Sequence, residues 1–212
     1  MAAIEALVAA METAKRPVFY TGGGVINSGT AASQLLRELV EATNFPITST
    51  LMGLGAYPGS GKNWIGMLGM HGLYEANMAM HGCDLMINIG ARFDDRITGL
   101  VEAFSPDSVK AHIDIDPSSI NKVIQADIPI VGDVAHVLED VLKVWKSRGR
   151  KTDKSGLQEW WAKIDDWRAV DCLKFEQVGQ VIRPQHALAR LEALTKDHDR
   201  YITTEVGQHQ MW

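Results

Sequence analysis

Apolar residues recur along the chain with two spacings, one typical of helices and the other typical of buried strands. Before Pro17, the apolar side chains that share one face of a predicted helix are Ile4, Leu7, Val8 and Met11. The run VFYTGGG after this helix is apolar until its glycines, which predicts a buried strand that enters a tight turn. A helix followed by a buried strand is the repeating unit of α/β proteins.

The same alternation of helix and strand continues as far as residue 146. Helical periodicity predicts three longer helices, over residues 30–43, 73–81 and 134–146. Apolar runs predict strands in FPITST, CDLMINIG, SVKAHIDID and IPIVGD, and Pro117 is placed to begin a short helix. Residues 51–72 are rich in glycine and show no clear period. The pattern predicts a Rossmann-like α/β fold, a parallel sheet of about six strands with helices on both faces.

The pattern changes after residue 146, where the stretch KSRGRKTDKSG is polar and basic and is interpreted as a solvated linker. A Trp-rich helix, LQEWWAKIDDWRAV, follows it, and then a helix opened by Pro184 and a strand in RYITTEVG. We therefore expect a first domain over 1–146, a linker with the Trp-rich helix over 147–183, and the start of a truncated second α/β domain over 184–212.

Charge and composition narrow the possible partners. The 212 residues include 21 Lys and Arg against 26 Asp and Glu, and the two signs are interspersed, which argues against nucleic acid as a partner. No run approaches the ~20 apolar residues that span a bilayer, so no membrane association is expected. The two cysteines, Cys83 and Cys172, suggest neither a zinc site nor a disulfide framework, which favours a cytoplasmic location.

Two glycine motifs and two histidines are weaker signals than they first seem. TGGGVIN lacks the third glycine of a dinucleotide fingerprint, because Asn27 stands there; a tight turn and a phosphate-binding turn remain equally good interpretations. AYPGSGKN departs from a P-loop at Ala56 and Asn63. His71 and His81 have no carboxylate at ligand spacing, so no metal site is expected.

The run GARFDDRITG brings four charges to the end of the plainest strand. Ligands of parallel sheets bind at the carboxyl ends of the strands, where Arg92 and Arg96 could meet a phosphate or a carboxylate. Asp114 and Asp133, at the ends of later strands, could accept hydrogen bonds from a ribose or an adenine. An extended dinucleotide that carries a diphosphate would suit this edge. The alternative is a cluster of Asp–Arg salt bridges that only orders the loop.

Six stretches taken together resemble one enzyme family. TGGGV, TLMGLGAYPG, GMLGMHG, GARFDDRITG, HIDIDP and TTEVGQHQMW, in this order, are similar to the large catalytic subunit of acetolactate synthase, a thiamine-diphosphate enzyme. The resemblance covers nearly the whole chain. Glyoxylate carboligase, a related thiamine-diphosphate enzyme, is a near alternative. A non-catalytic nucleotide-binding module is a second alternative, although such a module has no reason to carry GQHQMW.

The resemblance implies the central FAD-binding domain of that family and the start of its thiamine-diphosphate domain. Carried over by position, the FAD contacts would be Gly23, Gly24, Thr50, Leu51, Met70, His71, Gly90, Arg92, Asp94, Asp114, Ile115 and Asp133. The start of the thiamine-diphosphate site would be Gly207, Gln208 and His209. Arg96 would receive the carboxylate of the second 2-oxo acid, and Met70 would line the same tunnel.

The implied reaction condenses two pyruvates, or pyruvate and 2-oxobutyrate, with release of CO2 in branched-chain amino-acid biosynthesis. Its cofactors would be thiamine diphosphate, Mg²⁺ and FAD, with no net redox change of the flavin. The family's activating glutamate and its Mg²⁺ motif have no match in these 212 residues. We therefore expect no catalytic residue here and no activity of the chain alone. A homo-oligomer and a small regulatory subunit are the expected partners.

Overall fold

The computed structural model describes residues 1–149 and 151–207, which belong to two compact units. The first unit covers Met1–Val170 and the second covers Asp171–Trp212. In the described part of the second unit, helix α8 spans Pro184–Thr195, with its proline in the first turn as the sequence predicts. No helix within the described ranges has both the length and the apolar character that crossing a membrane requires.

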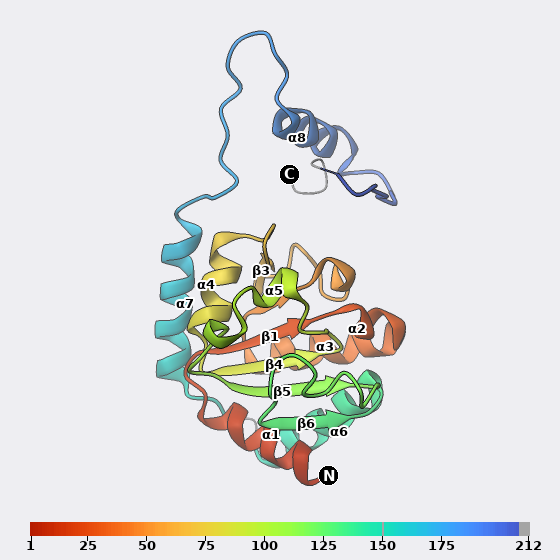
Figure 1. Cartoon of the computed structure of the whole chain (residues 1–212), viewed down its shortest axis with the longest axis vertical. Helices are drawn as coiled ribbons and strands as arrows, with labels where there is room; N and C mark the ends of the chain where they lie inside the picture. The colour runs from red at the N-terminus through yellow and green to blue at the C-terminus, as the bar shows by residue number, and fades with distance from the viewer. Residues whose placement is uncertain (150, 208–212) are drawn as a thin grey trace. The chain divides into compact units, whose positions relative to one another are not determined.

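A six-stranded parallel sheet forms the centre of the first unit, as the alternating pattern predicts (Figure 1). Its strands are β1 Pro17–Thr21, β2 Ile47–Ser49, β3 Trp64–Met67, β4 Leu85–Ile89, β5 Val109–Asp114 and β6 Ile128–Val131. The spatial order is β3-β2-β1-β4-β5-β6, and Phe19 of β1 pairs with Ile47 on one side and Ile87 on the other. The order reverses between β1 and β4, which is where doubly wound sheets open a crevice for ligands.

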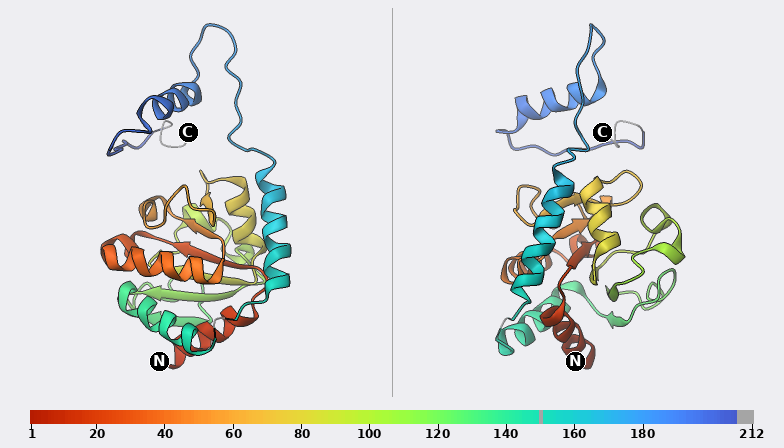
Figure 2. Two further views of the ribbon diagram at one scale, coloured as in Figure 1. Left: turned by 180° about the vertical axis from the view of Figure 1, so that it is seen from behind. Right: turned by 90° about the vertical axis from the view of Figure 1, so that its left-hand side faces the viewer.

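Helices cover both faces of this sheet (Figure 2). The longer ones are α1 Ala2–Thr13, α3 Thr30–Thr43, α4 Tyr74–Gly82 and α6 Val134–Ser147. Helix α3 packs against α6, and α4 lies on the opposite face, because right-handed crossovers on the two sides of a reversal point place their helices on opposite faces. All five residues of β1 and all five of β4 are buried, which explains their continuous apolar runs.

Helix α7, Lys154–Arg168, packs along the edge of the sheet where the strands begin. Its Trp160 indole donates to the carbonyl of Pro17, at the start of β1, over 3.1 Å. Trp161 donates to the carbonyl of Asn44, shortly before β2, over 2.9 Å. The Trp-rich helix that the sequence places in a linker is therefore part of the first unit, because its indoles satisfy carbonyls and bury apolar area there.

Three local expectations differ from the structure. Strand β3 lies inside the glycine-rich stretch 51–72, where its four residues are too few to show a period. Pro117 begins a turn instead of a short helix. Residues 200–207 follow α8 as expected, but none of them is in a strand, because strand geometry needs a hydrogen-bonded neighbour and the described part of this unit offers none.

Candidate functional site

The loop after β1 and the loop after β4 touch at the point where the strand order reverses. The backbone N–H of Gly24 donates to the carbonyl of Gly90 over 2.9 Å. A Cβ at Gly24 would lie 2.6 Å from the Cα of Gly90, and a Cβ at Gly22 would lie 2.5 Å from the Cα of Ala91. Both glycines are therefore required for contact between two backbones. A Cβ at Gly23 would meet only Met52, whose Cβ and carbonyl oxygen would lie at 3.4 and 3.5 Å, and Gly23 lines an open groove.

This groove has a volume of about 450 Å³ and runs over the carboxyl ends of the central strands. Its walls contain eight of the residues singled out from the sequence, namely Gly23, Gly24, Thr50, Leu51, Gly90, Arg92, Asp94 and Arg96. They come from short segments, α2 Gly23–Asn27, the 3₁₀ turn Leu51–Gly53 with its N-cap Thr50, and α5 Asp95–Thr98, and from the loop after β4. Residues that lie far apart in the sequence thus form one concave surface with exposed backbone and cationic side chains.

A second hollow, of about 510 Å³, lies on the other side of α5. It brings together Met70 and Arg96, the two residues expected to line a substrate tunnel. The backbone N–H of Met70 donates to the carbonyl of Arg96 over 2.8 Å, and the Asn77 side chain bonds both the N–H and the carbonyl of Gly69. Arg96 lines both hollows, so α5 forms the wall between them. His71 is exposed and is among the lining residues of neither hollow.

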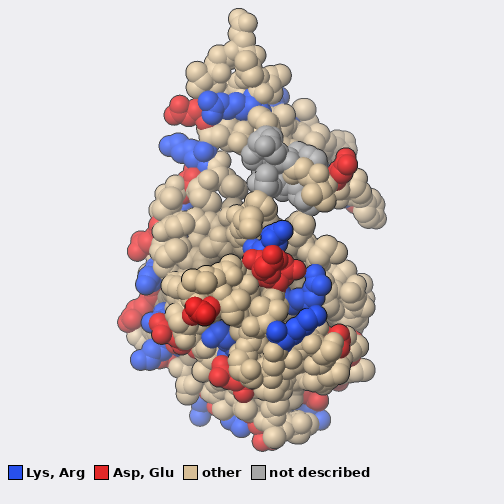
Figure 3. Space-filling view, viewed as in Figure 1, with Lys and Arg blue, Asp and Glu red and all other residues tan. Residues whose placement is uncertain are grey.

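The charged run forms two ion pairs at the surface. Arg92 lies 3.3 Å from Asp94, and Arg96 lies 2.8 Å from Asp95, as the salt-bridge alternative predicts. The guanidinium side chains are 79% and 67% exposed, and such pairs contribute only about 0–1 kcal/mol to stability. Both arginines therefore remain accessible to an anionic ligand. Acidic and basic side chains adjoin on this face of the molecule (Figure 3).

Asp94 has a local role as the N-cap of α5. Its carboxylate accepts a hydrogen bond of 3.1 Å from the backbone N–H of Arg96. That bond, together with the positive charges of Arg92 and Arg96, holds the pKa of Asp94 below its usual value. The carboxylate consequently stays charged and keeps the turn after β4 ordered.

The acidic residues after β5 and β6 are engaged in local contacts. Asp133 caps α6 by accepting from the N–H of Ala135, and the Ser28 hydroxyl donates to it over 2.9 Å. This hydroxyl, followed by the backbone donors of the cap, lowers the pKa of Asp133. Asp114 accepts from the backbone N–H of Asp116, and Ile115 is exposed. Asp114, Ile115 and Asp133 lie at the same edge of the sheet but are not among the residues that line the groove.

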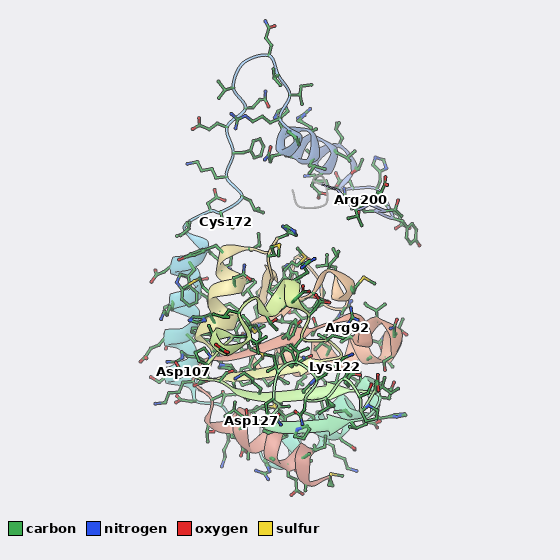
Figure 4. The ribbon with its side chains drawn as sticks, in the orientation of Figure 1. Arg92, Asp107, Lys122, Asp127, Cys172 and Arg200 are labelled. Carbon is green, nitrogen blue, oxygen red and sulfur yellow. The ribbon has the colours of Figure 1, made fainter. Side chains whose placement is uncertain are left out.

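Three buried polar residues that the sequence analysis did not single out hold the loop after β4 from below. Asn88 and His112 both bond the carbonyl of Ala91, and the Tyr20 hydroxyl donates to the carbonyl of Arg92. Burial raises the pKa of Tyr20 and lowers that of His112. The signal that could have revealed them is a polar residue inside an otherwise apolar strand. Figure 4 shows Arg92 among the side chains around this loop.

The remaining expected positions lie in the second unit. Gly207 is half-buried there, whereas Gln208 and His209 lie outside the described residues. Within residues 1–149 and 151–207, no three His, Cys, Asp or Glu side chains gather in a way that could hold a metal ion.

Comparisons with known proteins agree with this arrangement. Residues 4–141 match the family model described as "Thiamine pyrophosphate enzyme, central domain". The acetolactate synthase isozyme 3 large subunit of Escherichia coli is 47% identical over 210 residues, which are 99% of this chain and 35% of that protein. Acetolactate synthase 3, chloroplastic, of Brassica napus is 40% identical over 97% of this chain and 31% of its own length.

The large subunit from Haemophilus influenzae is similarly related, with 44% identity over 99% of this chain. The chain thus spans about a third of the length of the curated relatives that it matches, and the relatives from both bacteria are named large subunits. The family match covers more than half of the chain and includes all six strands and the groove at their carboxyl ends. The chain therefore belongs to the family of thiamine pyrophosphate enzymes, of which it contains the central domain.

Proposed function

We propose that this chain is the FAD-binding central part of an acetolactate synthase large subunit, followed by the start of its thiamine-diphosphate domain. In this assignment residues 1–146 form the FAD-binding domain and 184–212 begin the thiamine-diphosphate domain. Residues 147–183 contain the Trp-rich helix, which packs on the first domain, and the connection to the next. The whole protein condenses two pyruvates, or pyruvate and 2-oxobutyrate, to acetohydroxy acids with release of CO2. The similarity to named acetolactate synthases over nearly the whole chain supports this reaction.

The observation that carries the FAD proposal is the groove of about 450 Å³ at the reversal point of the sheet. Cofactor pockets commonly have volumes of about 300–1,000 Å³. Gly23 and Gly24 leave the backbone bare along one wall, and Arg92 supplies a planar set of donors that suits a diphosphate. The chemistry of these residues fits a dinucleotide.

The other expected FAD contacts extend the proposal beyond the groove. Met70 and His71 follow β3, and Asp114, Ile115 and Asp133 follow β5 and β6, so all five lie at the carboxyl edge of the sheet. We assign the adenine and ribose end of FAD to the side of the two aspartates. Asp133 would then serve both the α6 cap and the cofactor, since a carboxylate has lone pairs for more than two donors.

Arg96 and Met70 form the part of the proposed site that meets substrate. A carboxylate that leaves water needs a fixed cationic partner, and the Arg96 guanidinium borders a hollow with apolar walls, Met70 among them. These two residues would bind and orient the second 2-oxo acid. Thiamine diphosphate, when bound, supplies the electron sink for decarboxylation.

The remaining assignments concern the whole protein. Gly207, Gln208 and His209 would contribute to the thiamine-diphosphate site, whose Mg²⁺ would be held by residues outside this chain. FAD would act as an architectural cofactor without net redox change. The name "large subunit" of the relatives supports pairing with a small regulatory subunit, and we propose a homo-oligomer of large subunits in the cytoplasm.

Substitution of the two arginines in the full-length protein tests the assignment of Arg92 to FAD and of Arg96 to the second 2-oxo acid. We expect Arg92→Gln to weaken FAD binding at least about tenfold, because a charge-assisted contact contributes roughly 1.5–3 kcal/mol. Arg96→Gln should leave FAD affinity nearly unchanged and raise the KM for the second 2-oxo acid. Flavin fluorescence titration and steady-state kinetics measure these two effects.

Arg37→Gln is the matched control, because Arg37 is an exposed arginine of α3 that lines neither hollow. Equal loss of FAD affinity in the Arg37 and Arg92 variants would contradict the assignment of Arg92. A wild-type protein that binds no FAD would contradict the flavin site itself.

A further inference from the structure

The turn after β4 holds one exposed side chain between two buried ones. Ala91 is 2% exposed and Phe93 is 4% exposed, whereas the side chain of Arg92 between them is 79% exposed. Gly90, with φ of +64°, starts the turn in a conformation that favours glycine. The direction in which Arg92 leaves the backbone is therefore set by whatever fixes its two neighbours.

Three buried side chains from three adjacent strands converge on this turn. Asn88 of β4 donates to the carbonyl of Ala91 over 2.8 Å and accepts from its N–H over 3.1 Å. His112 of β5 lies with Nε2 3.2 Å from the same carbonyl. The Tyr20 hydroxyl of β1 donates to the carbonyl of Arg92 over 3.1 Å. Two consecutive carbonyls are thus held from within the protein.

His112 contacts both anchors of the turn. Its ring is fully buried and meets the Phe93 ring edge-on, with centroids 5.1 Å apart and an interplanar angle of 73°. One side chain therefore bonds the residue before Arg92 and packs against the residue after it. The ring also brings Nε2 to 3.8 Å from the carboxylate of Asp114, which is longer than a hydrogen bond.

The contacts of His112 determine its protonation. The Ala91 carbonyl can only accept, so Nε2 carries the proton, and Nδ1 is buried without a hydrogen-bond partner among the described residues. A second proton would create a buried donor with nothing to bond, which is costly. Burial accordingly lowers the pKa of His112, although Asp114 opposes the shift. The histidine is a fixed neutral donor at neutral pH.

We propose that His112 is a positioning residue that, with Asn88 and Tyr20, fixes the Ala91–Phe93 turn and so sets where the Arg92 guanidinium enters the groove. The proposal rests on the FAD site proposed above. In this proposal Arg92 contacts the ligand, and its contribution to binding depends on the buried donor His112, which itself touches no ligand.

Two substitutions in the full-length protein separate the effect of the His112 hydrogen bond on FAD binding from the effect of its packing. His112→Phe keeps a ring against Phe93 but removes one of the two donors to the Ala91 carbonyl, while Asn88 remains as the other. We expect the Kd for FAD to rise about fivefold, since a buried hydrogen bond is worth roughly 1 kcal/mol. His112→Gln restores an N–H donor at about the position of Nε2. Its Kd should stay within about threefold of the wild-type value.

Asn63→Ala is the matched control, because Asn63 is a fully buried amide whose side chain bonds Asn44 and Phe45 at the opposite edge of the sheet. It should lower the melting temperature measured without FAD but leave the Kd for FAD unchanged. If both His112 variants keep the wild-type Kd while Arg92→Gln loses affinity, the positioning role is wrong and the FAD site stands. If Phe and Gln at 112 weaken FAD equally, the role is one of packing and the proposal is also wrong.

A spectroscopic measurement tests the proposal without any variant that could fail to fold. The ¹⁵N shifts of His112 should show the neutral form with its proton on Nε2 at pH 7. A proton on Nδ1, or a charged ring, would overturn the assignment. Failure of the wild-type protein to bind FAD would overturn both this proposal and the proposed function. Wild-type affinity in both His112 variants, together with a loss of affinity in Arg92→Gln, would overturn this proposal alone.

Discussion

Gly24 and Gly90 show how single residues set the distance between two loops. At each glycine another backbone lies closer than any Cβ permits, and Gly90 in addition has a φ of +64° that favours glycine. The contact between the two glycines joins the loop after β1 to the loop after β4, and residues of both loops line the groove. Substitution of such a residue should therefore change both stability and binding.

We expect Gly24→Ala to lower the free energy of unfolding by about 1–3 kcal/mol, because its Cβ would lie 2.6 Å from the Cα of Gly90 and the backbone must shift. Gly59→Ala is the control, since a Cβ at Gly59 has no atom of the described structure within 4 Å; its effect should stay within about 0.5 kcal/mol. Urea unfolding of both variants measures the difference. Equal stabilities would show that the two loops separate without cost.

The pKa of His112 predicts how stability depends on pH. Burial lowers this pKa in the folded protein below the value of about 6.5 for an unfolded chain. Below pH 6.5 the unfolded state therefore binds a proton that the folded state does not, so His112 makes stability fall as the pH drops through that range. Above pH 6.5 both forms are neutral and the contribution is constant.

Chemical unfolding of the wild-type protein and of His112→Gln, measured as the pH is lowered from about 7.5 through 6.5, determines this contribution. The variant should lose stability less steeply below about pH 6.5, because its amide does not titrate. Parallel curves for the two proteins would contradict a lowered pKa at His112.

At the scale of elements, α7 has a role that its sequence conceals. Its indoles satisfy carbonyls near the starts of β1 and β2, and the Arg168 guanidinium donates to the carbonyl of Trp64 at the start of β3 over 2.7 Å. Trp160 is 1% exposed and packs edge-on against Trp167. The helix covers the edge of the sheet opposite to the groove, so it contributes stability without contact to the proposed ligands.

Trp160→Ala should accordingly lower the free energy of unfolding by about 3–5 kcal/mol, the usual cost of truncating a buried tryptophan. The Kd for FAD of the folded variant should not change, because Trp160 and the groove lie at opposite edges of the sheet. Thermal unfolding and flavin titration provide the two measurements. Trp64→Ala, which removes a partly buried ring on the same edge, should cost less, and the reverse order would contradict the importance given to α7.

At the scale of the whole molecule, the two edges of the sheet are used differently. The edge where strands begin is covered by α7, and the edge where they end carries both hollows. The residues proposed to bind cofactor and substrate would position those molecules, and the sequence analysis expects no catalytic residue among them. We therefore expect binding by this chain to be separable from turnover.

We expect the 212-residue polypeptide by itself to make no acetolactate from pyruvate when thiamine diphosphate, Mg²⁺ and FAD are supplied. The protein as its gene encodes it serves as the positive control in the same colorimetric assay. Product formation by the 212-residue polypeptide would contradict the proposed division between binding and turnover.

The sequence predicts the parallel sheet and its flanking helices well, because β1 and β4 are buried on both faces and their apolar runs are continuous. It also predicts that Gly23, Arg92 and their neighbours meet at one edge, since all follow strands. It does not predict β3, whose four residues are too few for periodicity, nor the contacts of α7, which depend on partners more than 100 residues away. The role of His112 is equally hidden, because a histidine within a strand does not reveal which carbonyl it will face.

The position of α7 has a consequence for anyone who exchanges parts between relatives. The polar stretch around residue 150 invites a cut there, since it has the composition of a spacer. A chimera joined at that point would combine the strands of one parent with the α7 of another. The indoles of α7 would then have to form their hydrogen bonds with carbonyls of a different parent. A junction after Val170 keeps each sheet together with its own α7, so that the first compact unit is exchanged whole.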